Sequence, residues 1–239
     1  MITPCPLPSL YAHEGVQVET GPTIRPGGFV LTDRALDLCR FAPKSLILDV
    51  GCGHGATVHR LHSHWNLTGM GMDPSPGMLT HGKGLPLIQG TGEVLPVADA
   101  RLDGILCECV LGATPDTTRI LKECFRILKP GGRMIVTDIY ARNPLQNGQT
   151  PLPMTCCFNG ARALADHVRT IGQQGFTPLH VEDHSRLLRD LAAHIVWNHG
   201  SLAGFWAAMF PALDTTCILS SIAAIKPGLF LCVARKEFP

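Results

Sequence analysis

The sequence lacks any long hydrophobic run. No stretch approaches the about 18 uncharged apolar residues that a membrane-spanning helix needs. The first residues, MITPCPLPSLYAHEG, lack both the basic segment and the continuous apolar segment of a secretory signal. We therefore expect no membrane association, no secretory signal and a cytoplasmic location.

An excess of charge of either sign is also missing. The chain has 20 Lys and Arg residues against 19 Asp and Glu residues, a formal net charge of +1 over 239 residues. No basic block or stripe stands out. Proteins that bind nucleic acid usually carry one, because phosphate contacts dominate their affinity. We therefore expect no nucleic-acid partner.

The ten cysteines include no CxxC pair. A chain of this length can bury a core without disulfides, so we expect reduced thiols, as in a cytoplasm. Hydrophobic residues make up 45% of the chain and charged residues 16%, which indicates a compact globular protein. The length suits one α/β domain with room for an insertion, and no internal repeat is visible.

The most informative stretch is a glycine-rich loop. Residues Asp49 to Gly55 read DVGCGHG and directly follow the apolar run Leu46-Ile47-Leu48. A buried strand that runs into alternating glycines and then a helix makes a loop suited to close backbone approach by a ligand. The positions of Gly51, Gly53 and Ala56 also satisfy the general dinucleotide fingerprint. The pattern predicts a nucleotide-like cofactor at this loop.

Apolar runs and helical periodicities alternate beyond this point, which predicts a parallel sheet with right-handed crossovers. The sequence of residues 1–25 predicts an irregular arm. A helix should begin at Thr32 and end before Pro43. Tyr11 and Arg25 either fold this arm over the cofactor or lie on the surface. The strands are expected at residues 46–50, 67–72, 87–88, 104–109, 133–138, 176–181 and 229–234.

Residues 185–227 form the main departure from this alternation. We expect a single domain over residues 1–239, with an arm at 1–30, a cofactor-binding core at 31–184, a helical insertion at 185–227, and the last strand and tail at 228–239. The insertion is rich in aromatic and large apolar side chains, among them Trp197, Phe205 and Trp206. It is a lid over the acceptor, a homodimer contact, or core packed on its own sheet face.

Four blocks, in this order, resemble the class I S-adenosylmethionine-dependent methyltransferases. They are DVGCGHG (49–55), GMDPSPGML (71–79), GTGEVLPVADARLDGILCECVL (90–111) and LKECFRILKPGGRMIVTD (121–138). The resemblance covers roughly residues 25–180. It implies S-adenosylmethionine as cofactor and an α/β fold: a Rossmann-like, doubly wound, mostly parallel seven-stranded sheet with a helical insertion before the last strand. A dehydrogenase would normally repeat the βαβαβ half, which this chain does not do.

The resemblance also implies a set of cofactor-binding residues. Gly51 and Gly53 leave room for the methionine portion, because neither has a Cβ atom. Asp73 ends the second strand, where a carboxylate can accept both ribose hydroxyls. Thr91 stands where relatives more commonly carry Asp. The full set is Asp49, Gly51, Cys52, Gly53, Asp73, Pro74, Thr91, Gly92, Glu93 and Cys107.

The expected reaction is methyl transfer to a small-molecule acceptor by in-line displacement, catalysed mainly by positioning. The segment Cys156-Cys157-Phe158-Asn159-Gly160-Ala161 resembles the arsenite methyltransferases, where a thiolate holds the metalloid. One alternative is therefore methylation of a metalloid such as arsenite via Cys156 and Cys157. An alternative of another class is a cofactor-binding assembly partner without turnover.

No catalytic residue is fixed by these patterns, and the candidates are Cys156, Cys157 and Glu108. Free cysteines are usually small buried side chains, which is the simpler explanation of Cys156 and Cys157. Cys107 and Cys109 should share one face of their strand, which favours packing. We expect no metal ligands, because His180 and His184 flank the strand at the sheet edge remote from the cofactor.

Overall fold

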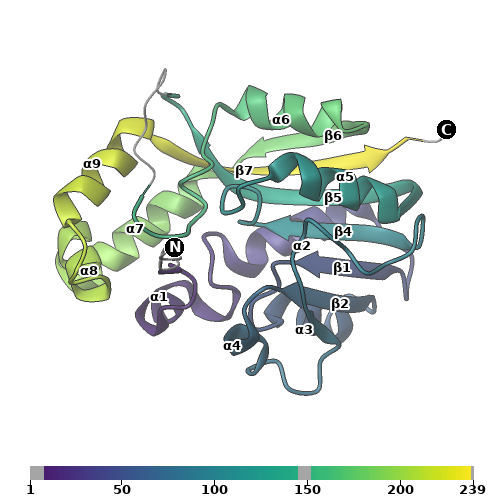
Figure 1. Ribbon diagram of the computed structural model, residues 1–239, viewed down its shortest axis with the longest axis horizontal. Coiled ribbons are helices and arrows are strands. Elements are labelled where there is room, and N and C mark those ends of the chain that lie inside the picture. The colour runs from purple at the N-terminus through teal and green to yellow at the C-terminus, as the bar shows by residue number, and fades with distance from the viewer. Residues whose placement is uncertain (1–7, 145–151, 238–239) are drawn as a thin grey trace, which may run out of the picture.

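In a computed structural model, which describes residues 8–144 and 152–237, the chain forms one seven-stranded sheet flanked by helices (Figure 1). The strand order is β3-β2-β1-β4-β5-β7-β6. The strands are β1 (Leu46–Val50), β2 (Thr68–Asp73), β3 (Leu87–Gln89), β4 (Leu102–Glu108), β5 (Leu128–Ala141), β6 (Phe176–Asp183) and β7 (Pro227–Lys236). The predicted Rossmann-like fold is confirmed.

The order of the strands places the cofactor loop at the centre. β1 pairs in parallel with both β2 and β4, and only β7 runs antiparallel to its neighbours β5 and β6. The order reverses between β1 and β4, which makes this a topological switch point. Ligands of open α/β sheets bind in the crevice outside the carboxyl ends of the strands at such a point.

Successive residues of each strand point to opposite faces, and this alternation builds two cores. On one face Leu48 and Ile105 pack against α5 (Thr117–Ile127) and α6 (Leu164–Gln173). On the other face Ile47 and Leu106 pack against α2 (Gly28–Cys39) and α3 (Ala56–Ser63). Burying each such side chain contributes about 1.5–3 kcal/mol, so the central strands are held from both sides.

The N-terminal arm differs from its prediction. It contains α1 (Glu14–Thr20), capped by the His13 side chain, and a 3-10 turn, η1 (Gly21–Thr23). Helix α2 begins at Gly28 rather than at Thr32, because Gly27 adopts a φ of 83° that ends the preceding turn. Thr32 is therefore fully buried inside the helix, where its hydroxyl serves the site described below.

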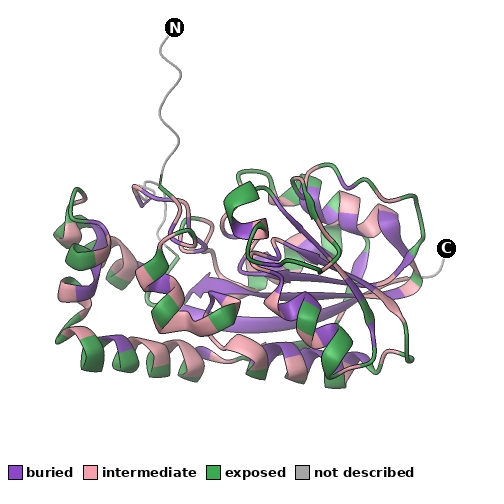
Figure 2. Cartoon of the chain, turned by 90° about the horizontal axis from the view of Figure 1, so that it is seen from below, coloured by how far each residue is buried: buried purple, intermediate pink, exposed green. Residues whose placement is uncertain are grey.

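The insertion consists of α7 (Ser185–His199), α8 (Leu202–Met209) and α9 (Thr215–Ile225). It forms a third core with α1 and with the segment before α6, in which Val16, Met154, Phe205 and Trp206 are buried. Figure 1 shows α8 and α9 beyond the left end of the sheet, next to α1. Figure 2 shows how exposed residues line the outer sides of the helices. The insertion therefore rests on the arm, with which it shares this core.

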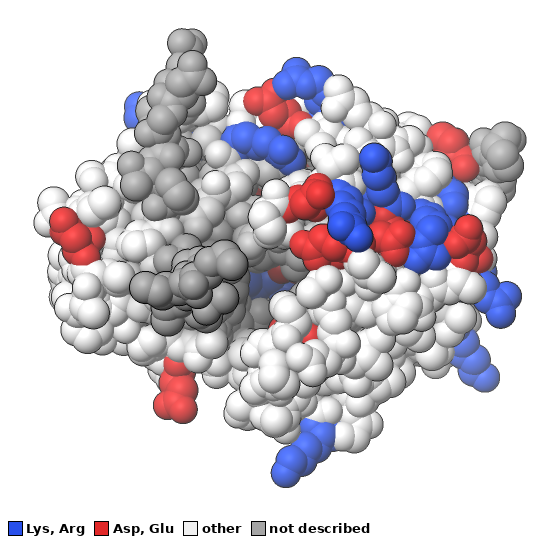
Figure 3. All heavy atoms as spheres, viewed as in Figure 1, with Lys and Arg blue, Asp and Glu red and all other residues white. Residues whose placement is uncertain are grey.

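The surface carries few charged side chains on the side of α8 and α9, and they gather instead near α5 in the view of Figure 3. There Arg126 pairs with Asp99 and Glu123, and Lys129 pairs with Asp103. Both signs are mixed, so this face has no basic patch. Within the described residues, no helix combines the length and the hydrophobicity needed to cross a membrane.

Candidate functional site

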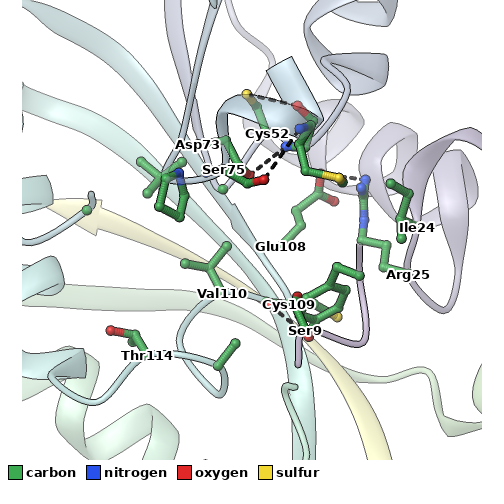
Figure 4. Close-up of a pocket in the computed structure, with 18 of the residues that line it drawn as sticks. Ser9, Ile24, Arg25, Cys52, Asp73, Ser75, Glu108, Cys109, Val110 and Thr114 are labelled. Atoms are coloured by element: carbon green, nitrogen blue, oxygen red, sulfur yellow. Dashed lines mark hydrogen bonds and ion pairs between the residues drawn. The ribbon is translucent and has the colours of Figure 1, made fainter. Parts of the chain in front are cut away.

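A cavity of about 480 Å³ lies at the carboxyl ends of β1, β2 and β4. This volume is in the range of about 300–1,000 Å³ that small-molecule sites occupy. Its walls come from the loops after β1, β2, β3 and β4 and from the N-terminal arm (Figure 4). Of the predicted cofactor residues, the cavity is lined by Gly51, Cys52, Gly53, Asp73, Pro74, Thr91, Gly92 and Glu93.

The glycine loop owes its path to residues without a Cβ atom. Gly51 and Gly53 have φ angles of 73° and 54°, in the left-handed region that L side chains rarely adopt. A Cβ atom on Gly51 would lie 2.5 Å from Cγ2 of Val110, so the loop after β4 closes directly over the loop after β1. A Cβ atom on Gly53 would approach Met78 at 3.4 Å, at the edge of the cavity.

Asp73 connects the glycine loop after β1 with the loop after β2. Its carboxylate accepts hydrogen bonds from the backbone N–H of Gly53 and of Ser75, both at 2.9 Å. An ionised carboxylate has about four lone-pair positions, so lone pairs remain for two hydroxyl groups in the cavity. The residues present therefore fit a ribose, and the glycine loop is held against the acid that would bind it.

The loop after β3 supplies the wall predicted for the adenine. A Cβ atom on Gly92 would lie 3.1 Å from Val50 and from Ile120, so a side chain here would require these neighbours to shift slightly. Glu93 accepts a hydrogen bond from the Thr114 hydroxyl at 2.9 Å, so it connects this wall to the loop after β4.

Arg25 and Glu108 form a buried ion pair on the opposite side of the cavity. Arg25 comes from the arm and Glu108 from the end of β4, and their charged atoms lie 2.6 Å apart (Figure 4). The hydroxyls of Thr32 and Thr57 also contact this pair, at 2.7–3.4 Å. Arg25 and Tyr11 both line the cavity, so the arm covers the site rather than lying free. Glu108, a catalytic candidate, is already occupied by these partners.

Two of the predicted cofactor residues lie elsewhere. Asp49 is buried and is not among the cavity-lining residues; burial, and next the proximity of Glu108, raise the pKa of its carboxyl well above the usual value. Cys107 is fully buried in the sheet core, where its thiol faces Cys124. The alternation of β4 explains this, because Glu108 takes the cavity side and Cys107 the core side. Neither side chain lines the cavity, so their contacts with the cofactor stay predictions.

The expected cysteine groupings also change. Cys156 packs into the core of the insertion, where burial raises the pKa of its thiol to about 12. Cys157 turns the other way and lies beside Cys109 and Asp138. Cys109 does not share a face with Cys107, because β4 ends at Glu108 and Cys109 has a φ of 58°. The pair that the fold assembles is thus Cys109 and Cys157, which the sequence spacing did not indicate.

Comparisons with known proteins agree with this geometry. The family described as Methyltransferase domain matches residues 48–136, from the glycine loop to β5. An arsenite methyltransferase of Halobacterium salinarum is 26% identical over 59% of this chain and 39% of its own length. A demethylmenaquinone methyltransferase of Corynebacterium kroppenstedtii is 32% identical over 52% of this chain and 56% of its own. The matched region thus spans about half or less of either relative.

A solved structure extends the likeness to nearly the whole fold. Phosphoethanolamine N-methyltransferase 2 of Haemonchus contortus, in complex with S-adenosyl-L-methionine, superposes with a TM-score of 0.68. It covers 94% of this chain and 56% of that one at 16% identity. Residues 48–136 thus match the methyltransferase-domain family, and the chain as a whole resembles the class I S-adenosylmethionine-dependent methyltransferases in its fold. In this family the cofactor is S-adenosylmethionine, as the sequence predicted, and the cavity around Asp73 fits it.

Proposed function

We propose that this methyltransferase-family chain transfers a methyl group from S-adenosylmethionine to a small-molecule acceptor. The cofactor supplies a methyl group that its sulfonium centre has already activated. Alignment of the acceptor and exclusion of water then account for most of the catalysis, and positioning can contribute up to about 7–11 kcal/mol. A dedicated base is needed only if the acceptor holds its proton at the working pH.

The observation that carries this proposal is the 2.9 Å hydrogen bond from the Gly53 N–H to the Asp73 carboxylate. It ties the loop that receives the methionine portion to the acid that receives the ribose. A site for a nucleoside with an amino-acid tail needs both parts at a fixed separation. The neighbouring residues Pro74, Thr91, Gly92 and Glu93 complete the nucleoside wall of the same cavity.

We assign Glu108 a positioning role rather than that of a base. Its carboxylate is 2.6 Å from the Arg25 guanidinium and 3.0 Å from the Thr32 hydroxyl. A carboxylate held by these donors is a poor proton acceptor for a substrate, because accepting a proton would break the ion pair. Its effect is to hold the arm over the cavity, which excludes water from the reacting atoms.

A turnover assay tests the proposal. The protein is incubated with S-adenosylmethionine and a panel of hydroxyl, amine, thiol and activated-carbon acceptors, and release of S-adenosylhomocysteine is measured. We expect release above the acceptor-free background with at least one class of acceptor. Tight cofactor binding with no release across the panel would instead support the cofactor-binding assembly partner without turnover.

Metalloid methylation is the second candidate, favoured by the arsenite methyltransferase relative and by the position of Cys157. The route through adjacent Cys156 and Cys157 has little geometric support, because their side chains enter different cores. We therefore assign this route to Cys157 with Cys109. Arsenite and a thiol should then release S-adenosylhomocysteine from wild type and from Cys156→Ser, but not from Cys157→Ser. Equal release by all three would remove this candidate.

A homodimer through residues 185–227 and a cytoplasmic location stay predictions. The most exposed large side chain on the insertion is Trp197, which is 87% exposed on α7. Sedimentation velocity of wild type and Trp197→Ser tests the contact. We expect wild type to sediment as a dimer and the variant to shift toward the monomer; a monomeric wild type would contradict the prediction.

A further inference from the structure

Three potential metal ligands meet beside the cavity. The Sγ atoms of Cys109 and Cys157 and a carboxylate oxygen of Asp138 all lie within 4.8 Å of one another. They come from three separate places: the residue after β4, the carboxyl-terminal part of β5, and the loop before α6. In a tetrahedral zinc site, bonds of about 2.0–2.3 Å place the ligand atoms in this range of separations.

The cluster is shielded from bulk solvent and its carboxylate is held in place. Cys109, Cys157 and Asp138 are 5%, 3% and 0% exposed. The two Asp138 oxygens accept hydrogen bonds from the N–H groups of Gly112 and Ile139, each at 2.8 Å. Each oxygen keeps one lone pair beyond these bonds, so the carboxylate can still bind a cation.

The backbone is strained where it brings these three ligand atoms together. Cys109 has a φ of 58°, and a non-glycine residue in this region is strained by on the order of 1–3 kcal/mol. At Gly112, a Cβ atom would lie 2.4 Å from the Cys157 carbonyl oxygen and 2.9 Å from the Asp138 carboxylate. Simple packing of two small thiols requires neither the strained residue nor the close approach.

One side of the cluster faces the cavity. Cys109 and Tyr11 line the cavity, whereas Asp138 and Cys157 lie behind them. The Tyr11 hydroxyl accepts a hydrogen bond from the Cys157 N–H at 2.8 Å, so the arm closes over the thiols. A cation held by the three ligands would therefore lie at the wall of the cavity, next to the Tyr11 hydroxyl.

We propose that Cys109, Asp138 and Cys157 bind a thiophilic divalent cation of the zinc class at the wall of the cavity. Two S–H bonds break and two metal–sulfur bonds form, and both protons leave to solvent; the carboxylate binds as it is and no oxidation occurs. The binding of this cation does not depend on the proposed methyl transfer.

Cobalt substitution tests the site without cofactor or acceptor. Co²⁺ is added to the reduced protein in a Cys5→Ser, Cys217→Ser background, which removes the exposed thiol at 217 and the thiol in the undescribed N-terminal residues. We expect one Co²⁺ per chain, a thiolate-to-cobalt charge-transfer band, and displacement by Zn²⁺. Cys109→Ser and Cys157→Ser should each lose most of the band, and Asp138→Asn should weaken binding while keeping the band.

Cys156→Ser is the matched control, because it alters the neighbouring buried thiol and should keep the full band. Circular dichroism and thermal melting show whether each variant is folded. No band with folded wild type, or a band that Cys109→Ser and Cys157→Ser retain, would overturn the proposal. Cofactor binding is measured separately, so a protein that binds S-adenosylmethionine but not Co²⁺ keeps the proposed function and loses only this site.

Discussion

The guanidinium of Arg25 lies 2.6 Å from the carboxylate of Glu108, across 83 residues of sequence. Their side chains are only 7% and 2% exposed, so the pair is largely shielded from bulk solvent. This contact fixes the N-terminal arm to the end of β4 and makes the arm one wall of the cavity. The cavity therefore owes one of its walls to the ion pair between Arg25 and Glu108, which lies outside the glycine loop.

Removing one member of this pair should destabilise the protein strongly. Arg25→Met leaves the Glu108 carboxylate buried without its partner, and such a change typically costs about 3–5 kcal/mol of the free energy of unfolding. Combining it with Glu108→Gln removes the unpaired charge, so the double variant should be more stable than Arg25→Met. Urea denaturation of the four proteins gives the coupling energy. If the double variant loses as much unfolding free energy as the two single variants together, Arg25 and Glu108 do not act as a unit.

Gly51→Ala should damage both the fold and cofactor binding. The left-handed φ costs roughly 1–2 kcal/mol for an L residue, and the new Cβ atom would meet Val110 at 2.5 Å. Gly84→Ala is the matched control, with a φ of 83° and nothing within 4 Å of the added atom. We expect Gly84→Ala to lose only the backbone cost and to keep its affinity for S-adenosylmethionine, as measured by calorimetry. Equal affinities of Gly51→Ala and Gly84→Ala for S-adenosylmethionine would show that the close approach between Gly51 and Val110 is unimportant for cofactor binding.

His167 should make the protein sensitive to acid. Burial, and next the proximity of Arg162, lower the pKa of His167 to about 3. Between pH 6.5 and about 3 the unfolded chain binds more protons than the folded one, so this contribution to stability is lost as the pH falls through that window. From pH 7 to pH 5 the loss amounts to about 2 kcal/mol.

The variant His167→Leu removes this titration and keeps an apolar side chain against Phe230. The difference in unfolding free energy between pH 7 and pH 5, measured in urea, should shrink by about that amount. His59→Gln, which changes an exposed histidine of α3, is the control and should leave the difference as in wild type. If the difference in unfolding free energy between pH 7 and pH 5 is unchanged in His167→Leu, this pH dependence does not come from His167.

The sheet and the glycine loop were predictable because their signals are local. The apolar run of β1 is followed directly by Gly51, and the apolar run of β2 ends directly at Asp73. The extent of β5 was underestimated, because the strand expected at residues 133–138 runs from Leu128 to Ala141.

The remaining parts of the site depend on contacts that no local pattern reports. Arg25 and Glu108 meet only after the arm has folded back over β4. The pairing of Cys109 with Cys157 depends on the left-handed backbone at Cys109, for which a cysteine gives no signal. The spacing of Cys156 and Cys157 suggested a dithiol, but neighbouring residues in a turn can face different cores.

The central claim is that the cavity around Asp73 binds S-adenosylmethionine, and calorimetric titration of wild type and Asp73→Ala tests it most directly. Asp99→Ala is the control, because Asp99 is exposed and pairs with Arg126 away from the cavity. We expect one cofactor per chain in wild type and Asp99→Ala, and at least tenfold weaker binding in Asp73→Ala, about 1.4 kcal/mol for a lost charged hydrogen bond. Unchanged affinity in folded Asp73→Ala, or no binding by wild type, would contradict the account.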